Sequence, residues 1–256
     1  MNIKAAALME IPYTLGFFIR TLRGVGAFMV RGRASFKIFV MQILFTFVEA
    51  LGITSLLALG IGVAINAMTM PFLAKISQER YSYPVLITVI MREAGPLLTA
   101  IIVIARSATA IATELAGMVV SHEVEAYISI GVDPIEHLAV PRFLGVTISL
   151  FLLNIYFSLF GLGASFVVAQ LFNPLPPGVY FDNLLQSLGI SDIVISIVKS
   201  ITFGMIVAVV AITSGFSVER ASTEIPVAGL KAVGSSLAWC VLVNILLSCL
   251  YYTAVN

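Results

Sequence analysis

The chain alternates long apolar runs with short polar stretches, and the apolar runs are long enough to cross a bilayer. A membrane core of about 30 Å requires about 20 apolar residues in a helix, because unpaired backbone groups are not tolerated in hydrocarbon. The pattern predicts five such helices, over residues 38–70, 85–120, 143–172, 193–212 and 233–255. The first is long for one span and too short for two, so we expect tilt or a bend near Gly60 and Gly62.

Basic residues outside the apolar runs predict the orientation. Six of them crowd the N-terminal segment, opposed by Glu10: Lys4, Arg20, Arg23, Arg31, Arg33 and Lys37. By the positive-inside rule this end is cytoplasmic, and counting spans places 121–142 and 215–231 inside and the C-terminus outside. Residues 8–36 mix apolar side chains with arginines, which is typical of a helix lying in the cytoplasmic interface. A sixth, re-entrant span is the alternative topology.

The composition excludes an ordinary soluble enzyme. Of the 256 residues 60% are hydrophobic and 11% are charged, which is too little polar surface to cover the chain in water. The net charge of +1 offers no basic field for nucleic acid. His122 and His137 are fifteen residues apart with no cysteine nearby, so we interpret them as surface histidines and expect no metal site. Because phosphate-binding loops and catalytic motifs are absent from the sequence, the energy for any uphill transport would come from elsewhere than this chain.

The second apolar segment is the most polar of the five. Four residues recur at seven-residue spacing and therefore share one helical face: Arg92, Thr99, Arg106 and Thr113. Charged side chains in lipid are costly, so this stripe should face a cavity, an interface or partner charges. Pro96 lacks an N–H and frees a backbone carbonyl near position 92 or 93, and a polar helix break at membrane depth is typical of binding sites. Alternatively, Arg92 and Glu93 extend to the outer interface.

A single amine, Lys199, interrupts the fourth segment and needs an acidic partner or water. Glu49, Glu93 and Asp192 are the candidate partners. If Lys199 and Glu93 both lie in the outer half of the membrane, they can flank a lipid head group. The alternative is a structural ion pair. For Glu49 an interhelical contact is favoured over substrate binding.

Residues 121–142, SHEVEAYISIGVDPIEHLAVPR, predict two short amphipathic helices in the cytoplasm. Gly131 can end the first in a left-handed cap, and Asp133 can cap the second, with Pro134 at its first position. An apolar face on a short solvated helix needs a protein partner.

Three segments carry a family resemblance. REAGPLLTAIIVIARSATAIATELAGM (92–118) and EVEAYISIGVDPIEHLAVPR (123–142) closely resemble the signature of the MlaE/YrbE permease family, and SDIVISIVKSITFG (191–204) is similar to the family's fourth helix, including Lys199. The resemblance implies an all-α integral membrane fold with an interfacial N-terminal helix and five spans, similar to ABCG-class exporters. It implies one permease domain over 1–256, with the interfacial helix in 1–37 and the five-span domain, including the cytoplasmic segment 121–142, in 38–256.

The resemblance also implies a function and partners. It implies the permease subunit of an ABC transporter that moves phospholipids between the bacterial inner membrane and the outer envelope, with a cytoplasmic N-terminus and a periplasmic C-terminus. The family works as a homodimer with a separate ATPase subunit, a periplasmic MCE-domain protein and, in many systems, a STAS-domain protein. The chain itself would hold no cofactor, since ATP and Mg bind to the ATPase. Its lipid cavity would lie at the dimer axis, lined by the first, second and fifth helices.

Two sets of site residues follow from the resemblance. Around the lipid cavity the family's charges correspond to Arg92, Glu93 and Lys199. Family members commonly carry an acid in the last helix, where this chain has Asn244, which can substitute only by hydrogen bonding, and Glu49 is the candidate for the missing charge. The family's coupling helix corresponds to residues 123–130, and the residues expected to couple to the ATPase are Glu123, Glu125, Tyr127, Ile128, Gly131, Asp133 and Pro134.

Two other functions remain open from the residues themselves. An ion-coupled secondary transporter could use Glu49, Glu93 and Lys199 as a relay. A membrane scaffold without transport activity would use the same charges as structural ion pairs.

Overall fold

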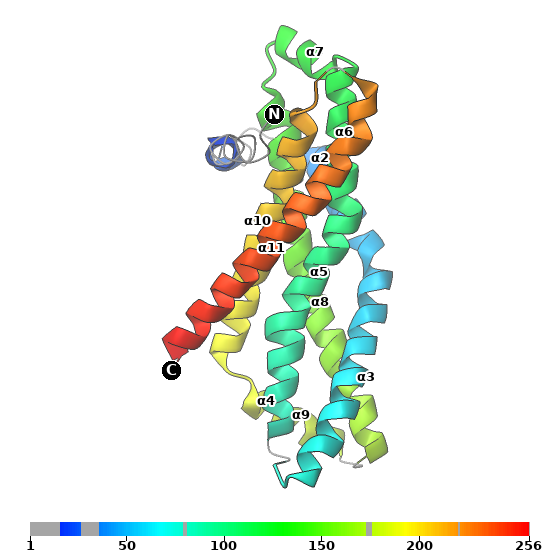
Figure 1. The fold of residues 1–256 in the computed structure, drawn as a ribbon, viewed down its shortest axis with the longest axis vertical. Helices are drawn as coiled ribbons and strands as arrows, with labels where there is room; N and C mark the ends of the chain where they lie inside the picture. The colour runs from blue at the N-terminus through cyan, green and yellow to red at the C-terminus, as the bar shows by residue number, and fades with distance from the viewer. Residues whose placement is uncertain (1–15, 27–35, 79–80, 173–175, 220, 256) are drawn as a thin grey trace, which may run out of the picture.

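The computed structural model describes residues 16–26, 36–78, 81–172, 176–219 and 221–255, and this part of the chain is a helical bundle without strands (Figure 1). A helix over residues 16–26 comes first. The remaining elements are α2 (Phe36–Thr46), η1 (Val48–Ala50), α3 (Leu51–Lys75), α4 (Ser82–Leu86), η3 (Ile87–Ala94), α5 (Gly95–Val103), η4 (Ile104–Ala108), α6 (Thr109–Val120), α7 (Glu123–Ser129), η5 (Ile135–Ala139), α8 (Val140–Phe172), α9 (Pro177–Ser187), α10 (Ile190–Phe216), η6 (Ser222–Glu224) and α11 (Ile225–Val255).

The predicted five-span architecture is confirmed. Within the described residues five helical stretches are long and apolar enough to cross a membrane: Phe36–Lys75, Ser82–Val120, Ile135–Leu171, Ile190–Phe216 and Ser222–Thr253. Each is longer than its apolar run, because the helices continue into the flanking polar segments. The 11-residue helix α9 is about 16 Å long, too short to span, and lies across the end of the bundle opposite α7 (Figure 1).

The bend in the first span lies elsewhere than expected. Helix α3 continues through Gly60 and Gly62, and the irregular turn is η1, which separates α2 from α3. Gly62 serves close packing instead, because a Cβ on it would overlap the backbone carbonyl of Gly161 in α8. The helix is not interrupted at these glycines, because a glycine in a membrane helix can allow a neighbouring helix to approach without bending its own.

The second span contains two π-helical turns, η3 and η4, which hold Arg92 and Arg106. A π turn contains an extra residue, so seven-residue spacing no longer keeps side chains on one face. Arg92 reaches Asp192 of α10, whereas Arg106 reaches Glu49 of η1, and Thr99 between them is fully buried. The single polar stripe is therefore not formed, although both arginines have the partner charges that we expected.

The five spans differ in how much of each is packed inside the protein. In the most apolar window of the second span, of α8 and of α10, 50% of residues are buried, against 22% for α2–α3 and 11% for α11. The core thus lies between the second span, α8 and α10. Helices α3 and α11 flank the second span in front of α8 and α10 (Figure 1) and keep broad apolar faces exposed.

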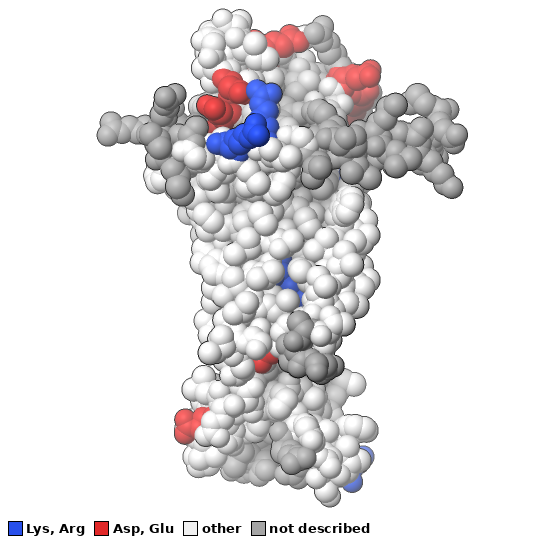
Figure 2. All heavy atoms as spheres, turned by 90° about the vertical axis from the view of Figure 1, so that its left-hand side faces the viewer, with Lys and Arg blue, Asp and Glu red and all other residues white. Residues whose placement is uncertain are grey.

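The end of the bundle near α7 carries the N-terminal helix and most of the visible charge. Figure 1 shows helix 16–26 end-on beside the bundle, so it lies across the long axis, as expected of an interfacial helix. Phe17 packs on Phe216 and Phe18 on Phe143, with ring centroids 6.3 and 6.2 Å apart. The rest of the predicted interfacial segment lies outside the described residues. On the face in Figure 2, charged side chains gather near this end, above a broad band with few charges that suits a membrane.

Candidate functional site

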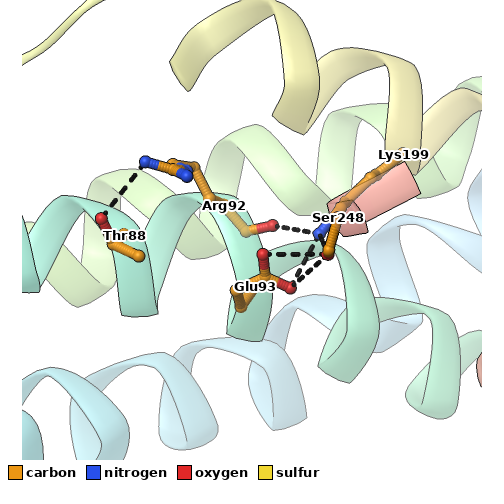
Figure 3. Close-up of polar contacts among 5 residues, drawn as sticks. All are labelled: Thr88, Arg92, Glu93, Lys199 and Ser248. Carbon is orange, nitrogen blue, oxygen red and sulfur yellow. Dashed lines mark hydrogen bonds and ion pairs between the residues drawn. The ribbon is translucent and has the colours of Figure 1, made fainter. Parts of the chain in front are cut away.

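Three spans bring a lysine, a glutamate and a serine together inside the membrane (Figure 3). Lys199 Nζ of α10 donates hydrogen bonds of 2.7 Å to Glu93 Oε2 of η3 and to Ser248 Oγ of α11. The Ser248 hydroxyl lies 3.1 Å from both Glu93 carboxylate oxygens and can donate to either. The Lys199 side chain is 0% exposed and that of Glu93 is 34% exposed. The amine is thus fully enclosed, while its carboxylate partner is partly open. We call these three residues the outer cluster.

A backbone carbonyl completes the environment of Lys199. Lys199 Nζ also donates to the carbonyl oxygen of Arg92, at 3.1 Å. In a regular helix that carbonyl would accept the N–H of residue 96, but Pro96 has none. The predicted freed carbonyl is therefore present, and the lysine uses it. The free carbonyl of Arg92 thus gains a donor, and the buried amine of Lys199 gains an acceptor.

A second ion pair adjoins the outer cluster. Arg92 Nη1 lies 3.2 Å from Asp192 Oδ1, with the two side chains 12% and 13% exposed. The guanidinium stacks 4.4 Å from the ring centroid of Tyr251, whose hydroxyl donates to Asp192 at 3.3 Å. Arg92 also donates to Thr88 Oγ1, at 3.4 Å. Two cations and two anions therefore lie side by side, and the group carries no net charge.

The helix positions place this group inside the spans, toward the end of the bundle that carries α9. Lys199 follows Ile190 by nine residues, about 13 Å of helix, and Glu93 follows Ser82 by eleven, about 16 Å. Ionised side chains at such depth are tolerated when they pair or line a polar cavity. Arg92 and Glu93 have protein partners at this depth, which does not fit simple extension to the interface.

The packing around η3 leaves no room for larger residues. A Cβ on Gly95 would lie 2.8 Å from Asn154 Oδ1 of α8. Asn154 Nδ2 in turn donates to Ser196 Oγ of α10 at 2.9 Å, about one turn before Lys199. Helices α8 and α10 are thereby fixed against the π turn that carries Glu93.

Two of the predicted site residues lie away from the outer cluster. Glu49 forms an ion pair of 2.8 Å with Arg106, so the expected interhelical contact is present. Asn244 lies one turn before Ser248 on α11, and its Oδ1 is buried without a hydrogen-bond partner in the described chain. The side chain of the last helix that reaches Lys199 is Ser248, which the sequence analysis missed. Isolated serines are common in membrane helices, so no pattern in the sequence distinguishes Ser248 from the others.

The turn within the predicted cytoplasmic segment, residues 121–142, is formed as Gly131 and Asp133 predicted. The second predicted short helix is not separate, because η5 continues directly into α8 and begins the third span, Ile135–Leu171. Gly131 has φ +79°, and the N–H groups of Gly131 and Val132 donate to the carbonyls of Ile128 and Tyr127 at 3.0 and 2.9 Å. Asp133 Oδ1 accepts the backbone N–H of Ile135 at 2.8 Å. These bonds end α7 and begin η5 at a fixed angle, and α7 projects beyond the bundle (Figure 1).

Helix α7 itself has no buried residue, and Ile128 is 60% exposed. Its acidic side chains make local contacts: Glu125 pairs with His122 at 2.7 Å and Glu123 accepts from Ser121 at 3.0 Å. Between this segment and helix 16–26 lies a cleft of about 930 Å³, lined by residues that include Phe17, Val124, Ile128, Pro134 and Phe216. Arg20 closes one side through an ion pair of 3.0 Å with Asp133.

Together the fold and the site define a multi-pass membrane protein that encloses polar groups within the bilayer. Residues 39–250 match the family described as permease MlaE, and the chain belongs to this family. It is therefore a transporter subunit of the permease type.

Curated relatives extend over most of the chain. A probable ABC transporter permease protein of Rickettsia prowazekii (strain Madrid E) is 24% identical over 216 residues, 84% of this chain and 83% of that protein. The chloroplast protein TRIGALACTOSYLDIACYLGLYCEROL 1 of Arabidopsis thaliana is 24% identical over 224 residues, 88% of this chain and 64% of the plant protein. A probable ABC transporter permease protein of Synechocystis sp. is 26% identical over 155 residues, 60% of this chain and 56% of that protein.

Proposed function

We propose that the chain is the permease subunit of an ABC transporter that moves phospholipids between the bacterial inner membrane and the outer envelope. The observation that carries the proposal is the outer cluster, a buried amine and a partly open carboxylate held by three spans in a member of the MlaE permease family. The names of the curated permease relatives support the ABC class. The multi-pass chain would lie in the inner membrane, with its N-terminus in the cytoplasm and its C-terminus in the periplasm.

The substrate site would use both charge pairs. A phosphate could exchange with Glu93 or Asp192 for the cations Lys199 and Arg92, while acyl chains lie on exposed apolar side chains such as Leu246 of α11. The incoming phosphate would displace one carboxylate from its cation, and the displaced group would be Glu93, which at 34% exposed can turn toward water or toward an ammonium group of the same lipid.

A homodimer would enclose this site. Helix α11 has 11% of its apolar window buried, so most of that face needs lipid or protein contact. We place a second copy there, with the cavity between the first, second and fifth spans of the two chains. Nucleotide-driven closure of the dimer would then shrink the cavity and release the lipid.

The energy for transport would come from a separate ATPase subunit that binds ATP and Mg and docks on the exposed α7. Glu123, Tyr127 and Ile128 belong to this helix, and its capped ends hold it rigidly enough to transmit motion into η5 and α8. An MCE-domain protein on the periplasmic side and a STAS-domain protein on the ATPase would complete the complex.

The two other functions are less well supported by the geometry. A proton or ion relay would need Glu49 near Glu93 and Lys199, but Glu49 pairs with Arg106 on another part of the second span. In a scaffold a structural ion pair would be expected to be enclosed on both sides, whereas here the amine is enclosed and the Glu93 carboxylate stays one-third open.

Reconstitution tests the proposal. The chain is assembled with its ATPase and periplasmic partner in liposomes, and transfer of labelled phospholipid is followed with and without ATP. We expect transfer that requires ATP and is indifferent to membrane potential. Transfer that follows an imposed ion gradient without ATP would identify a secondary transporter, and absence of any transfer would favour the scaffold.

A further inference from the structure

A second intramembrane ion pair lies on the second span, apart from the outer cluster. Arg106 of η4 donates one N–H to Glu49 Oε2 at 2.8 Å and another to the backbone carbonyl of Glu49 in η1. The pair therefore joins the two helix irregularities, the π turn of the second span and the break in the first. Irregular turns of this kind are often found at functional sites.

The pair lies at membrane depth, nearer the cytoplasmic side. Arg106 follows Arg92 by 106 − 92 = 14 residues, about 20 Å of helix, and precedes Val120 by 120 − 106 = 14 residues. The second span, Ser82–Val120, has 39 residues and is about 58 Å long, so both arginines are far from its ends. A hydrocarbon core of about 30 Å thus has Arg92 near its outer boundary and Arg106 in its inner half.

The pair is open to its surroundings. The side chains of Arg106 and Glu49 are 32% and 52% exposed, and Glu49 uses two of the five guanidinium donors. The structure gives the remaining donors and Glu49 Oε1 no other partner among the described residues. Nearby exposed side chains are apolar, including Val48 at 47% and Ile101 at 37%. Open charges on an apolar membrane surface are costly unless a polar group covers them.

We infer that the Glu49–Arg106 pair is a second head-group site of the transporter, selective for an amine-bearing zwitterionic phospholipid. The free guanidinium donors suit a phosphate, which Arg binds in a planar, two-pronged geometry. The open oxygen of Glu49 suits the ammonium group of the same head group. A lipid with an anionic head group and no amine would place its phosphate beside the Glu49 carboxylate with no ammonium group to offset it, and like charges repel.

This inference rests on the proposed function and extends it. The lipid would meet Glu49 and Arg106 in the inner half of the membrane and the outer cluster about 20 Å further out along the same span. The two charged groups thus give the head group one site toward each face of the bilayer.

Photo-crosslinking tests the inference. A benzophenone amino acid replaces Val48, which adjoins Glu49, in the assembled complex in membranes of phosphatidylethanolamine and phosphatidylglycerol, and adducts are identified by mass spectrometry. Leu159 on α8, 67% exposed, is the control position. We expect phosphatidylethanolamine to be enriched about tenfold over the membrane ratio at Val48, the effect of about one charge-assisted hydrogen bond, and not at Leu159.

Variants separate recognition from structure. Glu49→Gln should abolish the enrichment or turn it toward phosphatidylglycerol, because Arg106 then lacks its anion. Glu49→Gln/Arg106→Gln should fold, since both charges are removed together, and should crosslink lipid at the membrane ratio. The inference would be overturned if lipid adducts at position 48 had the membrane composition while Glu49 and Arg106 are both intact. Adducts to a second copy of the chain instead of lipid would also overturn it.

A parallel measurement on the same complexes distinguishes failure of the second head-group site from failure of the proposed transport function. ATP-driven transfer is measured in parallel on wild-type protein. If transfer proceeds while Val48 adducts have the membrane composition, the second head-group site is wrong and the transporter stands. If no transfer occurs at all, the proposed function fails first.

Discussion

The outer cluster and the cytoplasmic segment are both charged, but they are held in opposite ways. In the outer cluster, side chains from three distant parts of the sequence satisfy one enclosed amine, Lys199. In the cytoplasmic segment, backbone caps at Gly131 and Asp133 fix an exposed helix through neighbours in sequence. A buried ion pair loses much of its stability when one partner is removed, whereas an exposed segment depends on turn geometry. Substitutions that change charge should therefore affect the outer cluster most, and substitutions that change backbone conformation should affect the cytoplasmic segment most.

The largest effect should follow loss of one charge in the outer cluster. Lys199→Met leaves the Glu93 carboxylate without its cation, which we expect to cost about 3–5 kcal/mol of folding free energy and to abolish lipid transfer. Thermal unfolding of the purified protein and ATP-driven transfer measure the two effects. Glu93→Gln/Lys199→Met should be more stable than Lys199→Met alone, and Lys75→Met, on an exposed helix end, should behave as wild type. A double variant less stable than the single one would contradict the ion-pair account.

Backbone conformation should dominate in the cytoplasmic segment. Gly131→Leu places a branched side chain at φ +79°, at a cost of about 1–2 kcal/mol, and should release the ATPase by unfolding the end of α7. Gly131→Asn is the matched control, because asparagine tolerates this conformation. The measurement is the amount of ATPase that co-purifies with the permease. Equal recovery with leucine and asparagine would show that the left-handed turn is not needed for docking.

A smaller effect is expected from the hydroxyl in the outer cluster. Ser248→Ala removes one partner of both Lys199 and Glu93, which should cost about 1 kcal/mol and slow transfer about fivefold. Thr253→Val on the same helix is the control, since Thr253 bonds only to carbonyls of its own helix in the described contacts. Transfer rates of the two variants at equal protein content are compared. Equal rates would mean that Ser248 does not support the pair.

The smallest effect is expected at the end of the bundle that carries α9, which contains neither the outer cluster nor the caps of the α7 segment. Tyr180 of α9 is buried and shares a hydrogen bond of 2.7 Å with Ser165, and burial raises the pKa of its hydroxyl above 10.0. A raised pKa gives stability that is present below pH 10 and is lost as the pH rises above it. The unfolding temperature should fall between pH 8 and about pH 11. We expect Tyr180→Phe to make this fall smaller, and Tyr81→Phe, at an exposed residue, to leave the fall unchanged. If the unfolding temperature of Tyr180→Phe fell as much as that of the wild type, the loss of stability at high pH would come from other groups.

The difference between the two regions also explains what the sequence could predict. The five spans and the caps of the cytoplasmic segment depend on neighbouring residues, so apolar length, Gly131 and Asp133 sufficed. The carbonyl used by Lys199 followed from Pro96 in the same way.

Contacts between distant residues were not predictable to the same degree. Asp192 was a candidate for Lys199 but pairs with Arg92, because the π turn changes which face of the second span meets α10. Arg142 ends the segment predicted to lie in the cytoplasm, yet its side chain is 5% exposed and pairs with Glu114 at 2.7 Å. Such pairings depend on helix rotation, which spacing alone cannot fix once the helix departs from regular geometry.

The central claim is that the outer cluster handles the lipid head group during transport. The most direct measurement is ATP-driven phospholipid transfer by the assembled complex carrying Glu93→Gln/Lys199→Met, at a dimer content and ATPase occupancy matched to wild type. Because both charges are removed together, we expect the double variant to fold, and the matched dimer content checks this. The account predicts transfer reduced to the rate without ATP. Transfer at the wild-type rate would contradict it.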